Sequence, residues 1–97
     1  MKIHTNLNLT LCTYENAIEQ VGIEYHKATR SHGFFSSPHE LKAVLEEELD
    51  EFWDSVKAND PDPQELIQIA ATAIAGVVWL SRKASQELEL TRTKKEG

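Results

Sequence analysis

The sequence predicts an all-α protein, and three observations support this. Apolar residues recur at spacings of three and four over three stretches, which is the period of an amphipathic helix. Two of these stretches begin with a capping residue followed by proline, and glycine or proline punctuates the segments between them. We expect one domain over residues 1–97, irregular at 1–12, with helices at about 13–31, 38–58 and 63–90 and a frayed tail at 91–97.

Length and composition indicate a small soluble protein. A chain of 97 residues buries a limited core, so association of copies is a realistic way to bury more. The net charge of −6 argues against a nucleic-acid partner. Cys12 is the single cysteine, the start lacks the pattern of a signal peptide, and the apolar run Ile69–Leu80 is too short to cross a bilayer. We therefore expect a cytoplasmic protein without a membrane partner.

The first helix is predicted from a single apolar face. Tyr14, Ile18, Val21, Tyr25 and Ala28 alternate at spacings of four and three. A C-terminal stop is expected at the glycine of residue 33, and a short loop with two phenylalanines follows.

The second helix has a clear start and stop. Ser37 is a good N-cap, Pro38 suits the first helical position, and Glu40 completes a capping box. One face of this helix is apolar, formed by Leu41, Val44, Leu45, Leu49, Phe52 and Val56. The run 59–63, Asn-Asp-Pro-Asp-Pro, is the strongest helix breaker in the chain.

The third helix repeats the start signal, with Asp62 as cap and Pro63 at the first position. It is apolar nearly all round, so it must be covered on more than one side. We therefore expect a homo-oligomer, a dimer or tetramer, in which the helical hairpin of helices two and three is completed to a four-helix bundle. Trp53 and Trp79 lie off the main faces and suit a subunit interface. Thr72 and Gly76 leave room for close helix approach or for a ligand.

Carboxylates interrupt the apolar face of helix two. Glu48 falls near its middle and Glu51 one turn further on at its edge, beside Glu47. Burying an unpaired charge is costly, and neighbouring carboxylates repel. A divalent cation removes both penalties, and oxygen ligands suit Mg²⁺ or Mn²⁺. The alternative is a solvated acidic face.

A second polar pair, Glu65 and Gln68, lies on one flank of helix three. Because helices two and three form a hairpin, this pair can face Glu48 and Glu51 across it. The alternative for Glu65 is a capping-box glutamate that completes the start of its own helix.

These residues resemble a known motif. Glu48-x-x-Glu51 followed by Glu65-x-x-Gln68 is similar to the paired motif of the MazG-like, all-α nucleoside triphosphate pyrophosphohydrolases. The resemblance spans roughly residues 25–80. The turn at residues 36–38 (Ser-Ser-Pro) and the apolar spacing from Pro38 to Glu48 also match this family. Two stretches resemble its small, often phage-encoded, single-domain branch: residues 32–35 (His-Gly-Phe-Phe) with 38–40 (Pro-His-Glu), and residues 65–71 (Glu-Leu-Ile-Gln-Ile-Ala-Ala).

The resemblance implies hydrolysis of nucleoside or deoxynucleoside triphosphates between the α and β phosphates, giving the monophosphate and pyrophosphate. It implies Mg²⁺, with Mn²⁺ as a substitute, held by Glu48, Glu51, Glu65 and Gln68. Glu47 would support the metal site or orient the attacking water, so Glu47 and Glu48 are the catalytic candidates. The family usually has Asp where this chain has Gln68, which can coordinate through its carbonyl oxygen but adds no charge.

Substrate contacts are expected from both sides of the site. Phe34, Phe35 and His39 lie where a base could stack, although the two phenylalanines equally suit an ordinary core. Candidates for the remaining contacts, including neutralisation of the triphosphate, are Lys42, Thr72, Arg82 and Lys83. Two other functions remain open: a non-catalytic helical interaction protein on the same scaffold, and a phosphoribosyl-ATP-type pyrophosphohydrolase.

Overall fold

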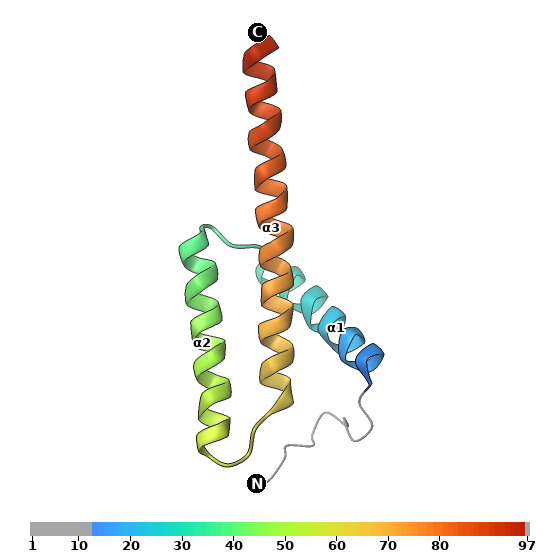
Figure 1. Ribbon diagram of the computed structural model, residues 1–97, viewed down its shortest axis with the longest axis vertical. Helices are drawn as coiled ribbons and strands as arrows, with labels where there is room; N and C mark the ends of the chain where they lie inside the picture. The colour runs from blue at the N-terminus through green and yellow to red at the C-terminus, as the bar shows by residue number, and fades with distance from the viewer. Residues whose placement is uncertain (1–12, 97) are drawn as a thin grey trace.

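The computed structural model describes residues 13–96, which form three helices and no strand. They are α1 (Tyr14–His32), α2 (Pro38–Lys57) and α3 (Pro63–Glu96) (Figure 1). The all-α class is therefore confirmed. Residues 1–12, expected to be irregular, and Cys12 with them, lie outside the described residues.

The third helix is longer than expected. We expected it to end near Leu90 with a frayed tail at 91–97, but α3 continues to Glu96. No proline or glycine interrupts residues 82–96, and most of these residues are strong helix formers. Loss of apolar periodicity, on which the expected end was based, does not itself stop a helix.

The predicted cap at Ser37 and the predicted stop at Gly33 both form, and α1 in addition begins on an N-cap at Thr13. The predicted capping box is not completed, because the Glu40 carboxylate accepts from the Ser36 N–H at 3.4 Å and from the Ser36 hydroxyl. The Thr13 hydroxyl accepts a hydrogen bond from the Asn16 N–H at 3.2 Å, and the Ser37 hydroxyl accepts one from the Glu40 N–H at 3.1 Å. Gly33 closes α1 with φ 71°, a conformation that favours glycine, and its N–H donates to the Thr29 carbonyl at 3.0 Å.

The connection from α2 to α3 excludes a capping-box role for Glu65. The Asp62 N–H, which a capping-box glutamate would accept, donates instead to the Ser55 hydroxyl at 3.2 Å. The Asp62 carboxylate accepts from the Gln64 N–H at 2.9 Å and so caps α3. The Glu65 carboxylate is therefore not used at the helix start.

The central element is α3, since α1 and α2 both pack on it and not on each other (Figure 1). Between α1 and α3 lies a small core of Val21, Ile67 and Ala71, with Tyr25 packed against it. On the other side, a Cβ atom added to Gly76 would lie 2.9 Å from Leu41 Cδ2, so glycine lets α2 approach closely there.

Much of the apolar surface stays uncovered. No residue of α2 is buried, and Trp53 is 55% exposed. Among the described residues, the segment Pro63–Leu90 is long and apolar enough to cross a membrane by length and composition, a criterion that core helices of soluble proteins also meet. The expectation of no membrane partner stays a prediction.

Candidate functional site

A hydrogen bond between α2 and α3 fixes the centre of the candidate site. The Thr72 hydroxyl donates to Glu48 Oε2 at 3.0 Å, and both side chains are partly buried. Glu48 projects toward α3 because it shares the face of α2 that carries Leu41 and Phe52. The carboxylate predicted to lie in the apolar seam is therefore held between the two helices.

Two carboxylate oxygens at this interface lack partners. Glu48 Oε1 and Glu65 Oε2 are both buried and accept no hydrogen bond. A buried acceptor without a donor costs about 1–3 kcal/mol, and more when it is charged. An oxygen-preferring cation or a proton would relieve that cost at both atoms.

The electrostatics of the site agree with this geometry. Burial raises the pKa of the Glu48 carboxyl above its ordinary value, and the hydrogen bond from Thr72 partly opposes this. The negative charges of Glu51, Glu47 and Glu65 raise that pKa further. The pKa of Glu65 is also raised, first by burial and then by the charge of Glu51 and a hydrogen bond with its carboxyl. The predicted carboxylates thus influence one another across the hairpin.

The remaining predicted ligands surround this centre without closing around it. Glu51 and Glu47 are exposed, whereas Gln68 is half-buried on α3. Among residues 13–96, no three or more His, Cys, Asp or Glu side chains stand together as a group that could hold a metal ion.

A groove beside Glu48 opens between all three helices, and we name it the carboxylate groove. Its volume is ≈ 240 Å³. It is lined by Glu24, Lys27, Ala28, Ser31, Glu48, Gln68, Ala71 and Thr72. The groove gives a ligand access to both Glu48 and Gln68.

A second and more apolar cavity, also of ≈ 240 Å³, adjoins the first, and we name it the aromatic pocket. It shares Ala28, Glu48, Ala71 and Thr72 with the carboxylate groove. The rest of its lining is Tyr25, Thr29, Gly33, Phe34, Phe35, Glu40, Val44 and Ala75. Small residues on α1 and α3 leave this space open beside Glu48.

The two phenylalanines predicted to contact substrate line the aromatic pocket and also pack on α3. The Arg82 guanidinium lies over the Phe34 ring, 5.2 Å from its centroid. Phe35 meets Trp79 edge to face at 5.8 Å, and the Lys83 ammonium lies 5.5 Å from the centre of the Trp79 ring. The two phenylalanine rings are half-buried, which is compatible both with stacking on a nucleobase and with packing in an ordinary core.

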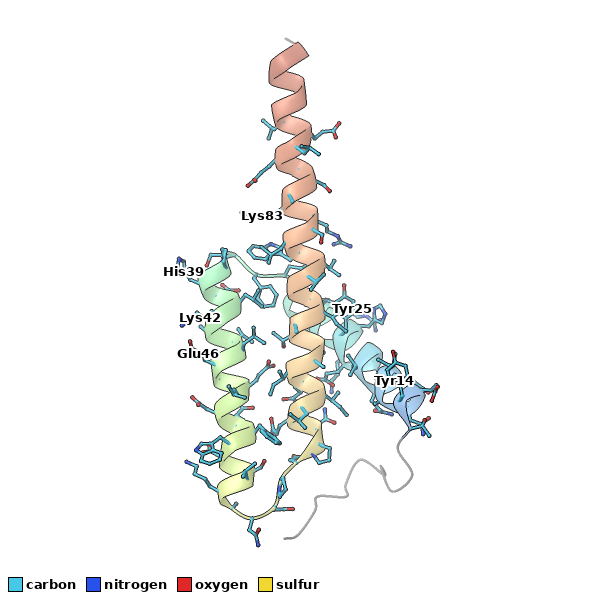
Figure 2. The ribbon with its side chains drawn as sticks, in the orientation of Figure 1. Tyr14, Tyr25, His39, Lys42, Glu46 and Lys83 are labelled. Atoms are coloured by element: carbon cyan, nitrogen blue, oxygen red, sulfur yellow. The ribbon has the colours of Figure 1, made fainter. Side chains whose placement is uncertain are left out.

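Four predicted substrate contacts line neither cavity. Figure 2 shows His39, Lys42 and Glu46 on the side of α2 that is turned away from α3. Lys42 is exposed and forms an ion pair with Glu46 one turn on. Neither His39 nor Lys42 lines the carboxylate groove or the aromatic pocket. Arg82 and Lys83 line neither cavity, and about 15 Å of helix separates residue 72 from residue 82.

One cation beside the site, on α1, was not predicted from the sequence. Lys27 lines the carboxylate groove together with Glu48 and Gln68, and its side chain is exposed. The available signal was its place next to Ala28, on the edge of the apolar face of α1. This position indicates that Lys27 reaches the groove only when it is known that α1 packs on α3 beside the hairpin.

The raised pKa values predict a pH dependence of stability in the absence of metal. A carboxyl whose pKa is higher in the folded protein holds its proton more tightly there than in the unfolded chain. The resulting stability is fully present below the ordinary value of 4.5 and is lost as pH rises through the raised values of Glu48 and Glu65. We therefore expect a smaller free energy of unfolding at about pH 7.5 than at about pH 5.5. Urea denaturation in chelator at both pH values measures it.

The variant Glu48→Gln isolates this effect from that of the other titrating groups. It should reduce the difference between the two pH values, because one of the two responsible carboxyls is gone. An unchanged difference in Glu48→Gln would show that Glu48 is not the group responsible.

Comparison with models of protein families, with curated proteins and with solved structures finds no match to this chain.

Proposed function

We propose that this chain is a MazG-like, metal-dependent hydrolase that cleaves nucleoside or deoxynucleoside triphosphates to the monophosphate and pyrophosphate. One observation carries the proposal: the buried, unpartnered oxygens of Glu48 and Glu65, which lie on two facing helices. Their order and spacing with Glu51 and Gln68 resemble the metal-binding motif of that family.

The donor set suits Mg²⁺ or Mn²⁺. Glu48, Glu51 and Glu65 would offer carboxylate oxygens and Gln68 an amide carbonyl, all of them hard oxygen ligands. When bound, such a cation polarises phosphate oxygens and lowers the pKa of a coordinated water. Since Gln68 brings no charge, affinity would depend mainly on the three glutamates.

The protein's own residues would position the reactants. Thr72 holds one oxygen of Glu48 by the 3.0 Å hydrogen bond and leaves the other oxygen unpartnered. Glu47 is exposed next to Glu48 on α2, where it could accept a proton from an attacking water. Glu51 lies close enough to Glu65 for its charge to raise the pKa of the Glu65 carboxyl, so the two carboxylates could share one cation.

The aromatic pocket would receive the nucleobase. It opens directly beside Glu48 and Thr72 and contains the rings of Phe34, Phe35 and Tyr25. Aromatic side chains stack on any base, so the pocket would bind a nucleotide without selecting a particular base.

Lys27 is the cation best placed to neutralise the triphosphate, in place of Lys42. It lines the carboxylate groove, whereas Lys42 pairs with Glu46 on the far side of α2. Lys27→Ala should raise KM on the order of 10-fold, which corresponds to about 1.4 kcal/mol. The matched control is Lys42→Ala, for which we expect KM to stay within about 2-fold. Equal effects of the two variants on KM would remove Lys27 from this role.

A substrate panel with pyrophosphate release as readout tests the proposed function. The common NTPs and dNTPs and phosphoribosyl-ATP are incubated with protein and Mg²⁺ or Mn²⁺. Metal-dependent pyrophosphate from at least one nucleoside triphosphate supports the proposal. Turnover of phosphoribosyl-ATP alone would assign the related activity instead, and no turnover of any compound would favour a non-catalytic helical scaffold.

The proposal includes a homo-oligomer in which the α2–α3 hairpin forms half of a four-helix bundle. Its support is the apolar side of the hairpin away from α1, where Leu49 is 57% and Val77 65% exposed. We propose that this oligomer acts in the cytoplasm, without a nucleic-acid or membrane partner.

A further inference from the structure

The polar side chains that line the aromatic pocket offer mainly hydrogen-bond acceptors. Two of them are the carboxylates of Glu40 and Glu48, which only accept hydrogen bonds when ionised. The Thr29 hydroxyl already donates to the Tyr25 carbonyl at 2.9 Å, and the Thr72 hydroxyl already donates to Glu48 at 3.0 Å. The phenol of Tyr25 is the remaining hydroxyl of the lining. A base bound in this pocket would therefore be recognised mainly through its own hydrogen-bond donors.

The carboxylate of Glu40 is held in place by Ser36, the residue before the cap of α2. One of its oxygens accepts a hydrogen bond from the Ser36 N–H at 3.4 Å, and the other accepts one from the Ser36 hydroxyl at 2.5 Å. A carboxylate has about four acceptor positions, so each oxygen keeps one for a ligand. The Glu40 side chain is exposed, and a ligand in the pocket can therefore reach a carboxylate that is already oriented.

A row of three residues along α2 gives the pocket a direction. Glu40, Val44 and Glu48 follow one another at intervals of four residues, and all three line the pocket. The eight residues between its ends correspond to about 12 Å of helix. This span suits a nucleotide with its phosphates at Glu48, its sugar over the apolar Val44 and the edge of its base at Glu40. Phe34 and Phe35 belong to the loop that precedes α2, so their rings lie at the Glu40 end, where the base would stack.

Guanine is the common nucleobase whose edge matches a carboxylate. Its ring N1–H and its exocyclic amino group are adjacent donors, so both oxygens of Glu40 can accept from one base, as carboxylates do from arginine. Adenine and cytosine place a ring acceptor beside the amino group, and uracil and thymine place carbonyl oxygens on both sides of the ring N–H. Each of these other edges would set an acceptor against a carboxylate oxygen, which loses a hydrogen bond and adds repulsion.

We propose that Glu40 selects guanine nucleotides by accepting two hydrogen bonds from the edge of a guanine held in the aromatic pocket. The aromatic rings supply stacking, which every base provides, and the carboxylate supplies the choice among bases. This inference rests on the proposed function, which makes the ligand a nucleotide, and it narrows the preferred substrate to GTP or dGTP.

The kcat/KM values for nucleotides with different bases test this selection during turnover. GTP should exceed inosine triphosphate, which lacks only the exocyclic amino group, by about 10- to 100-fold, the usual effect of losing one hydrogen bond to a charged group. ATP, CTP and UTP should be poorer substrates than inosine triphosphate, because each sets an acceptor against the carboxylate. Equal kcat/KM values for GTP, inosine triphosphate and ATP would overturn the selection and leave the hydrolytic activity standing.

The variant Glu40→Gln distinguishes recognition of the base from a structural role of this side chain. Its amide offers one acceptor and one donor, which match the amino group and the neighbouring ring acceptor of adenine. The ratio of kcat/KM for GTP to kcat/KM for ATP should therefore fall at least about 10-fold, a change of preference that a lost contact with Ser36 would not produce. The matched control is Glu46→Gln, on the side of α2 turned away from α3 (Figure 2), and it should keep the wild-type ratio. A wild-type ratio in Glu40→Gln would remove Glu40 from recognition of the base.

Binding of nucleosides to the metal-free protein separates this inference from the catalytic proposal. Amide NMR titrations with guanosine, inosine and adenosine in chelator measure recognition of the base without phosphates, metal or turnover. Guanosine should bind on the order of 10-fold more tightly than inosine or adenosine, with the largest shifts at residues 33–36 and 40, and Glu40→Gln should lose this preference. If no nucleoside triphosphate is hydrolysed, a preference for guanosine would still support the inference, and only the catalytic proposal would fail. Equal affinities for the three nucleosides, or no binding of any of them, would overturn the inference.

Discussion

Glu48→Gln should abolish pyrophosphate release without weakening the fold. Glu48 combines the hydrogen bond from Thr72 with a buried, unpartnered oxygen, so it is the most firmly fixed of the proposed ligands. Loss of its charge removes several kcal/mol of stabilisation around the metal and phosphate, or on the order of 10³-fold in kcat/KM. Steady-state pyrophosphate release on the best substrate of the panel measures this loss.

The same variant should be as stable as the wild type or more stable when metal is absent. Replacing a buried charge whose pKa is raised by burial removes an unfavourable interaction from the folded state. Asp50→Asn is the matched control, because Asp50 is exposed and points away from α3. It should retain full turnover. Wild-type turnover in Glu48→Gln would remove Glu48 from the site.

Mg²⁺ or Mn²⁺ should raise the melting temperature of the wild-type protein substantially. A ligand that binds the folded state only, at ten times its Kd, adds about 1.4 kcal/mol of stability. For a domain of this size, each kcal/mol corresponds to roughly 4–8 °C. Thermal unfolding with and without metal, at constant ionic strength, measures the shift.

The metal effect should depend on the carboxylate contributed by α3. Glu65→Gln should lose most of the metal-dependent shift, since it removes the ligand from the second helix. Glu19→Gln, at an exposed position of α1, should keep the shift. A shift of the same size in Glu65→Gln would indicate general binding of cations to an acidic surface.

Local signals in the sequence predicted most of the helical architecture. The caps at Ser37 and Asp62 and the stop at Gly33 are interactions within a few residues, so they can be read directly from the chain. The end of α3 was predicted too early. Apolar periodicity indicates the part of a helix that packs against a neighbour, and α3 continues beyond the part that packs against α1 and α2.

The candidate site was only partly predictable, for a related reason. Helical periodicity placed Glu48 on the inner face of α2, and the hairpin brought it to Thr72. Periodicity alone could not place Lys27 or exclude Lys42 from the groove, because both depend on where α1 lies relative to the hairpin. The capping-box role predicted as the alternative for Glu65 was excluded by Ser55, a residue that the helix-start pattern does not include.

Paramagnetic broadening of amide NMR signals by Mn²⁺ tests most directly whether carboxylates from two helices share one cation. At substoichiometric Mn²⁺, we expect the strongest broadening at residues 47–52 and 65–69, and little at Glu15, Glu19 or Glu87, toward the far ends of the helices. In Glu48→Gln that broadening should largely disappear. Uniform weak broadening over all acidic residues, unchanged in Glu48→Gln, would contradict the existence of the site.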